Sequence, residues 1–134
     1  MALDLTKLKG VSEELVAKLQ EAELLDSDKL LAAAGPAKAR KELAETLGLA
    51  QKELLEIANR ADLGRLKGIG PVFSDLLEYA GVDTVMELRQ RNAENLFKKI
   101  QEVAEEHDAK RLPRLEDVQS WVAQAKEMER AIHY

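Results

Sequence analysis

The segment Lys67-Gly68-Ile69-Gly70-Pro71 combines residue types and spacing that suit the binding of an anion. Two glycines flanking one apolar residue favour a turn whose backbone N–H groups are not covered by side chains. Pro71 is suited to the first turn of a following helix. The unpaired N–H groups and the dipole at a helix start attract negative charge. The segment therefore predicts a turn that holds a phosphate group through Gly68, Ile69 and Gly70.

Basic side chains surround this turn in the sequence. Residues 59–71 contain three basic residues and one acidic residue, a local balance of +2. Lysine and arginine neutralise phosphates, and contacts with the phosphate backbone carry no base information. We therefore predict binding of phosphate groups without any reading of bases. The expected contact residues are Arg60, Arg65, Lys67, Gly68, Ile69, Gly70 and Pro71, with Lys9 and Gly10 from a related turn near the start of the chain.

The related turn belongs to an internal repeat. Residues 8–31 align with residues 66–89 at an offset of 58, and six of the 24 pairs are identical. The agreement falls on the glycine turn and on the apolar positions of the following helix, which are the positions that would build a fold. We interpret the chain as two repeats, about 3–62 and 63–134, within a single domain of residues 1–134.

The first copy of the turn departs from the second. Ser12 replaces the second glycine, so a phosphate would approach the backbone less closely. Glu13 and Glu14 then place two carboxylates at the helix start, where they suit the dipole and occupy the place of an incoming anion. We therefore expect weak binding at best.

The elements that must position these turns are helices. Hydrophobic residues make up 46% of the chain and aromatic residues only 4%, a composition rich in the helix formers leucine and alanine. Apolar spacing predicts a helix after each turn, one after Pro36 that buries Leu43 and Leu47, one over 51–62, one capped by Asn92, and a last one from about Leu115 to Ala131. Residues 107–114 are expected to form a loop. No strand pattern is present, so we predict an all-α fold of eight to ten short helices.

Residues 62–71 resemble the hairpin of helix-hairpin-helix proteins, in which a Gly-apolar-Gly turn joins two short helices. That resemblance implies non-specific binding of the DNA backbone. The whole chain resembles more closely a bacterial family of uncharacterised proteins, a domain of unknown function with two such units, which implies tandem helix-hairpin-helix repeats packed as one pseudo-symmetric domain. The matching pieces are Ala58-Asn59-Arg60-Ala61-Asp62-Leu63, Lys67-Gly68-Ile69-Gly70-Pro71, Ala80-Gly81-Val82-Asp83-Thr84 and Val118-Gln119-Ser120-Trp121-Val122-Ala123-Gln124-Ala125-Lys126.

A second interpretation of the Gly-Ile-Gly turn is architectural. The turn would then be a tight corner between helices with Ile69 buried, and the chain would be a helical protein–protein interaction module that binds no nucleic acid. The net charge of −5 favours this hypothesis, because nucleic-acid affinity depends on cationic side chains. The intact second turn favours DNA binding, and the sequence leaves both hypotheses open.

The sequence contains no motif that indicates another class of function. The chain has no cysteine, and His107 and His133 share no metal-ligand spacing. No nucleophile-elbow or phosphate-loop motif occurs. We therefore expect no catalysis, metal or cofactor. No apolar run approaches the roughly 18 residues of a membrane span and no signal peptide is recognisable, so we expect a cytoplasmic protein without a membrane partner.

Overall fold

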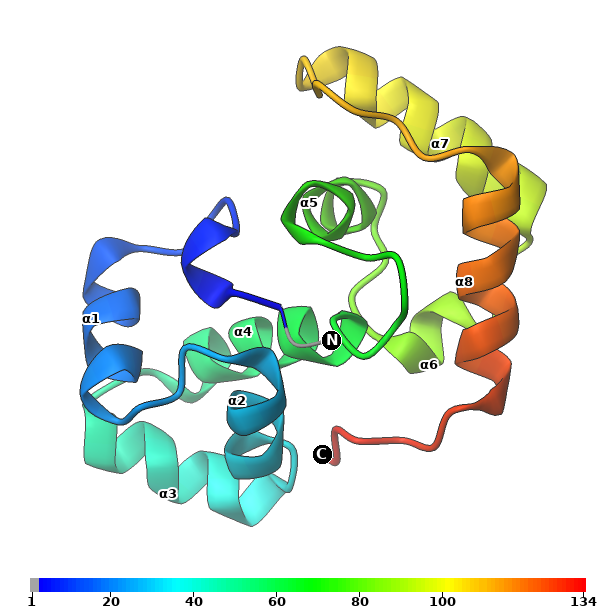
Figure 1. The fold of residues 1–134 in the computed structure, drawn as a ribbon. Helices are drawn as coiled ribbons and strands as arrows, with labels where there is room; N and C mark the ends of the chain where they lie inside the picture. The colour runs from blue at the N-terminus through cyan, green and yellow to red at the C-terminus, as the bar shows by residue number, and fades with distance from the viewer. Residues whose placement is uncertain (1–2) are drawn as a thin grey trace.

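The computed structural model describes residues 3–134, and they form a helical structure. Within this range there is no β-strand, only an isolated bridge between Asp4 and Asp26. The prediction of an all-α fold is confirmed. The elements are the 3-10 helix η1 (Leu5–Lys7) and the α-helices α1 (Glu13–Glu21), α2 (Ser27–Ala34), α3 (Ala37–Leu47), α4 (Gln51–Leu63), α5 (Pro71–Tyr79), α6 (Val85–Leu88), α7 (Ala93–Glu106) and α8 (Leu115–Glu127) (Figure 1).

The helices begin where polar side chains can accept bonds from free N–H groups. Asp26 caps α2, Thr84 caps α6 and Asn92 caps α7, each through its side-chain oxygen. Gly48 ends α3 in the left-handed conformation, with φ of 67°. The cap at Asn92 confirms the one predicted from the sequence.

The buried apolar side chains form two clusters. The first cluster contains residues 3–61 and one distant member, Ile132. The second cluster contains residues 63–125, with Trp121 among its largest buried side chains. In Figure 1, α1, α2 and α3 lie on one side of the molecule and α6, α7 and α8 on the other, with α4 and α5 between them. The elements that carry the two glycine turns therefore meet near the middle of the molecule.

Two sequence predictions about the helices need correction. The last helix ends at Glu127 and not near Ala131, because residues 128–134 run back in an extended path toward α2 (Figure 1). This path buries Ile132 in the first cluster. In α3 the predicted inward residues Leu43 and Leu47 are only partly buried, because Arg40 and Ala44 occupy the inward positions.

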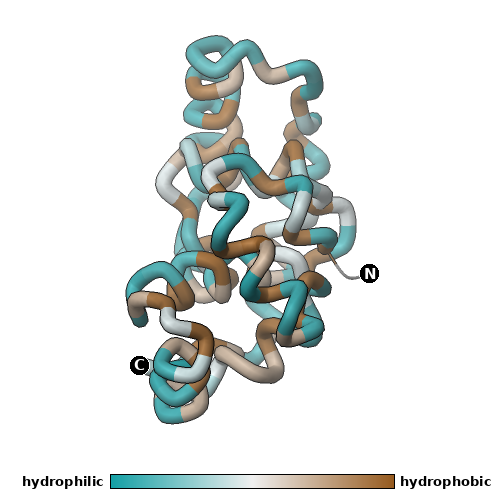
Figure 2. The backbone as a smooth tube through the Cα atoms, turned by 90° about the vertical axis from the view of Figure 1, so that its left-hand side faces the viewer, coloured by the Kyte–Doolittle hydropathy of each residue, from teal (hydrophilic) through white to brown (hydrophobic). Residues whose placement is uncertain are grey.

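Hydrophobic and hydrophilic residues alternate in short stretches along the helices (Figure 2). This alternation is expected for amphipathic helices packed around internal clusters. Across the described residues, none of the helices has the length and apolar character needed to cross a membrane.

Candidate functional site

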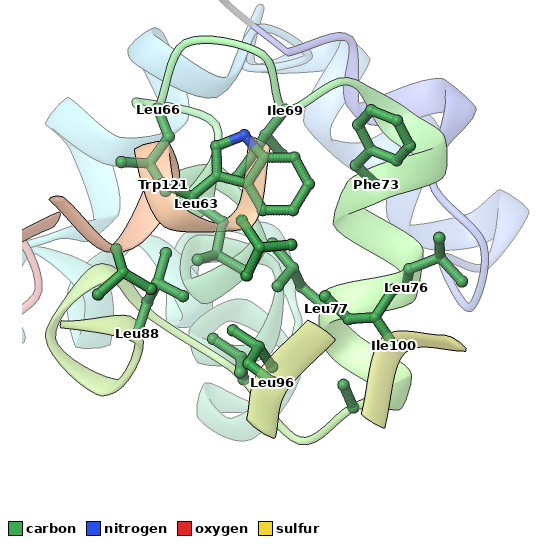
Figure 3. Close-up of a cluster of buried hydrophobic side chains, with 14 of the residues drawn as sticks. Leu63, Leu66, Ile69, Phe73, Leu76, Leu77, Leu88, Leu96, Ile100 and Trp121 are labelled. Carbon is green, nitrogen blue, oxygen red and sulfur yellow. The ribbon is translucent and has the colours of Figure 1, made fainter. Parts of the chain in front are cut away.

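The second hairpin, residues 66–70, connects α4 to α5 in the conformation that its glycines allow. Gly68 has φ of +91°, in the region that side chains disfavour. Gly70 is extended and precedes Pro71, the first residue of α5. Ile69 is only 7% exposed and packs in the second cluster near Trp121 (Figure 3). The hairpin thus has a buried apolar side chain between two glycines, as both interpretations of the sequence require.

One side chain of α8 holds the second hairpin from outside. The Lys67 N–H donates to Gln124 Oε1 at 2.9 Å, and Gln124 Nε2 donates to the Lys67 carbonyl at 3.2 Å. A Cβ atom at Gly68 would lie 3.2 Å from Trp121 Nε1. The hairpin therefore approaches α8 closely at Gly68, and both backbone groups of Lys67 are occupied.

Two backbone N–H groups of the second hairpin have no such partner. Lys67 and Gly68 form a turn that directs the Ile69 N–H back toward the hairpin itself, whereas the N–H groups of Gly68 and Gly70 make no hydrogen bond among residues 3–134. A Cβ atom at Gly70 would meet nothing within 4 Å, so this position borders open space. The arrangement leaves two donors, at Gly68 and Gly70, without an internal acceptor just before α5.

A groove of about 630 Å³ lies between the second hairpin and η1. We call it the second-hairpin groove; it is lined by Leu3, Asp4, Lys7 and residues 66–71. Its charged residues are Lys7, Lys67 and Asp4, a balance of +1. The side chain and backbone of Thr6 donate hydrogen bonds to Asp4, which lower the pKa of its carboxyl below the usual value. Lys7 was not among the predicted site residues, because its position beside the hairpin depends on the packing of η1.

The predicted contacts Arg60 and Arg65 do not line the second-hairpin groove. Arg60 is 6% exposed, and its guanidinium donates to Ser74 Oγ, to the Lys9 carbonyl and to Asp75. Arg65 Nε donates to Asp62 Oδ1 at 2.8 Å, and its Nη1 donates to the Glu129 carbonyl at 2.9 Å. Both guanidinium groups therefore have internal acceptors, and neither extends the basic rim of that groove.

The first hairpin, residues 8–12, has the related backbone conformation. Gly10 has φ of +83°, close to the value of Gly68. The Lys9 N–H donates to Asp75 Oδ1 at 3.0 Å, and the Lys9 carbonyl accepts from Arg60 Nη1 at 3.1 Å. We call Arg60 and Asp75 the buried ion pair; their side chains are 7% and 9% exposed. The first hairpin is therefore fixed to α4 and α5 by charged groups that solvent hardly reaches.

The groove beside the first hairpin has the opposite electrostatic character. This first-hairpin groove, about 540 Å³, is bordered by Lys9, Gly10 and Arg60 and by three carboxylates, Glu53, Glu56 and Glu78. Shielding from solvent in the groove raises the pKa of Glu78; Arg60 opposes this effect, and nearby carboxylates reinforce it. Lys9 and Gly10 therefore face acidic surroundings, which disfavour an incoming phosphate.

The comparison with protein families gives one match that spans most of the chain. Residues 9–128 match the family described as Domain of unknown function (DUF4332). The chain belongs to this family. No match was found among curated proteins, and none among solved structures. The matched DUF4332 region includes Lys9, Gly10 and the whole second hairpin, and it stops before the extended path of residues 129–134.

Proposed function

We propose that this DUF4332 protein is a non-catalytic binder of the nucleic-acid backbone, and that it binds phosphate groups through the second hairpin without reading base sequence. One observation carries the proposal. The N–H groups of Gly68 and Gly70 have no acceptor within the described part of the chain, and both glycines border a groove rimmed by Lys7 and Lys67. Backbone donors at a helix start with flanking cations are suited to phosphate.

We further propose that the two hairpins are copies of one helix-hairpin-helix unit. Backbone features recur at the offset of 58: Gly10 and Gly68 both have positive φ, and so do Glu23 and Gly81, at 60° and 86°. The bond that closes the end of the following helix recurs as well, from the Leu24 N–H to the Leu19 carbonyl at 2.8 Å and from the Val82 N–H to the Leu77 carbonyl at 2.9 Å. These shared features support a common origin for the two units.

Binding is expected to be weak and confined to the second hairpin. The first hairpin has Ser12 where the second has Gly70, and the Ser12 hydroxyl accepts from the Leu15 N–H at 3.1 Å. This cap occupies one helix-start donor that an anion would use. Together with the acidic first-hairpin groove, it leaves one basic hairpin to contact phosphate.

The test compares two charge reversals at positions related by the offset. Lys67→Glu alters the second hairpin and Lys9→Glu alters the first, and both side chains are exposed. Each variant changes the net charge by the same amount, so a difference between them is not an effect of total charge. Fluorescence anisotropy with a labelled duplex and a labelled single strand, at low and near-physiological salt, measures the binding.

We expect salt to weaken binding by the wild type, with a slope that reflects the few phosphates neutralised. Lys67→Glu should weaken binding at least tenfold at low salt, because it reverses a charge at the donor site, whereas Lys9→Glu should have a small effect. An equal loss of affinity in both variants would show that binding depends on the net charge of the protein and not on the second hairpin. No binding by a folded wild type at low salt would refute the proposed function.

A protein-interaction function is the second candidate. The net charge of −5 and the carboxylates of the first-hairpin groove favour a partner with a basic surface over nucleic acid. If the anisotropy measurement shows no nucleic-acid binding, this candidate gains support and the search turns to basic partner proteins. In that case Glu53→Lys together with Glu56→Lys should abolish capture of the partner.

A further inference from the structure

Residues 129–134 are extended and bind to the first half of the molecule, at a surface that we call the seat. The chain leaves α8, which packs in the second cluster, and places Ile132 in the first cluster with only 2% of its surface exposed. Ile132 is the single buried member of that cluster beyond residue 61 among the described residues, and the partly buried Ala131 packs beside it. Residues 129–134 therefore provide part of a core that is otherwise built from the first half of the chain.

Backbone hydrogen bonds fix this segment in a specific register. The His133 N–H donates to the Gly35 carbonyl at 2.9 Å, and the His133 carbonyl accepts from Arg40 Nη2 at 2.7 Å. Arg40 is itself 8% exposed and is oriented by donation to the carbonyls of Ala34 and Gly35. A buried guanidinium thus holds the segment through a main-chain group.

Gly35 allows the segment to approach closely. A Cβ atom at Gly35 would lie 2.4 Å from the Ala131 carbonyl oxygen and 2.8 Å from the Leu31 carbonyl oxygen of α2, both closer than Cβ atoms approach a backbone oxygen. The seat between the end of α2 and the start of α3 therefore combines three elements: an apolar position for Ile132, a donor and an acceptor for the His133 backbone, and space at Gly35. Such a seat has the properties of a site for an extended peptide.

The connection to α8 does not bind the segment tightly to its own half. Met128 has extended dihedral angles at the end of α8, and Glu129 and Arg130 are exposed. Met128 still packs against the second cluster and its N–H donates to the Ala125 carbonyl at 3.3 Å, but among residues 3–134 the exposed pair Glu129 and Arg130 is joined to the second half by one hydrogen bond, from Arg65 to the Glu129 carbonyl. An exposed connection of this kind can direct the same segment to a seat on another molecule.

We propose that the seat formed by Gly35, Arg40 and the first cluster is a peptide-binding site, and that its partner is residues 129–134 of a second copy of this chain. Exchange of the segment between two copies retains every contact of the seat, so only the connecting residues differ between monomer and dimer. A short tether gives the attached segment an effective concentration of about 1 mM. Exchange therefore becomes appreciable as the protein concentration approaches that value.

The experiment uses two complementary variants of the full chain. Ile132→Asp prevents the segment from entering the seat but leaves the seat intact. Gly35→Ala places a Cβ against the Ala131 carbonyl, so it blocks the seat but leaves the segment intact. The two variants are mixed and examined by analytical ultracentrifugation up to about 1 mM, after circular dichroism has confirmed that each is helical. The control mixture pairs the double variant with Ile132→Asp, because neither chain then offers an intact segment.

We expect each variant alone to sediment as a monomer and the mixture to approach twice the mass of one chain, while the control mixture remains monomeric. A monomeric mixture of two folded variants would refute the proposal. If either variant fails to fold, hydrogen exchange of the wild type decides. The proposal requires the His133 N–H to exchange faster than the Leu30 N–H, which bonds to the Asp26 carbonyl inside the first half. Equal protection would show that the segment opens only with global unfolding and would overturn the proposal.

Discussion

The two hairpins present the same backbone groups to different partners. In the first, the N–H and carbonyl of Lys9 are held by the buried ion pair of Arg60 and Asp75. In the second, the N–H and carbonyl of Lys67 are held by the single amide of Gln124 on α8. The first hairpin is therefore a joint between the halves of the molecule, and the second leaves donors free at the surface. Related turns can thus take different roles when their anchoring side chains change.

The strongest test of this comparison removes one member of the buried ion pair. Asp75→Ala leaves the Arg60 guanidinium with an uncompensated buried charge and the Lys9 N–H without its acceptor. We expect the free energy of unfolding to fall by about 3–5 kcal/mol, measured by urea denaturation. A loss no larger than that of a surface hydrogen bond would show that the first hairpin is not held by this pair.

The glycines of the two hairpins provide a matched pair of smaller effects. Gly10→Ala and Gly68→Ala both place a side chain at positive φ, which costs roughly 1–2 kcal/mol. Gly68→Ala should cost more, because its Cβ would also lie 3.2 Å from Trp121 Nε1, whereas Gly10 has nothing within 4 Å. Thermal denaturation of both variants measures the difference. A larger loss for Gly10→Ala would contradict the packing of the second hairpin against α8.

Removal of the Gln124 amide should have a modest effect. Gln124→Ala deletes both hydrogen bonds to Lys67, each of which lies near solvent that can replace it. We expect a loss of about 0.5–1.5 kcal/mol in urea denaturation, clearly less than for Asp75→Ala. Similar losses in the two variants would mean that the two hairpins are held with similar strength.

The pH dependence of stability sharpens the electrostatic side of the comparison. The pKa of Glu78 is raised in the folded state by shielding in the first-hairpin groove. A raised folded-state pKa of a carboxyl contributes stability that is present below its ordinary value of 4.5 and lost as pH rises through the folded-state value. Glu78→Gln removes this loss, so the variant should become more stable relative to wild type as pH rises from 4 toward 7.

Urea denaturation across this pH range gives the difference in unfolding free energy. Glu53→Gln is the charge-matched control, because Glu53 lines the same groove at an exposed position. A relative stability of Glu78→Gln that falls as pH rises would contradict the direction of the Glu78 pKa shift.

The sequence predicted the all-α fold because helix signals are local. Apolar spacing, the Asn92 cap and the Gly48 stop depend on residues within a few positions of each other. The end of the last helix was wrong because it depends on a distant partner: Gly35 accepts the bond from His133 across the molecule. Local periodicity contains no information about such a contact.

The sequence predicted the second hairpin of the candidate site but not the residues that surround it. The glycine pattern identified the second hairpin and its conformation at Gly68. Counting basic residues could not separate Lys67, which is exposed, from Arg60, which is buried against Asp75. Asp75, placed among the apolar residues of α5, was a signal of a buried charge that needs a partner. Lys7 and Gln124 had no comparable signal, because only packing brings η1 and α8 to the hairpin.

The hydrogen bond between Lys9 and Asp75 also bears on how the chain folds as it is synthesised. The two residues are 66 positions apart, and translation proceeds at roughly 5–20 residues per second. Several seconds therefore pass between synthesis of Lys9 and synthesis of its acceptor, Asp75. Helix α1 is synthesised well before the first hairpin, which precedes it, can form this bond. A nascent chain arrested before Asp75 would therefore have a first hairpin without its acceptor, open to proteases and chaperones.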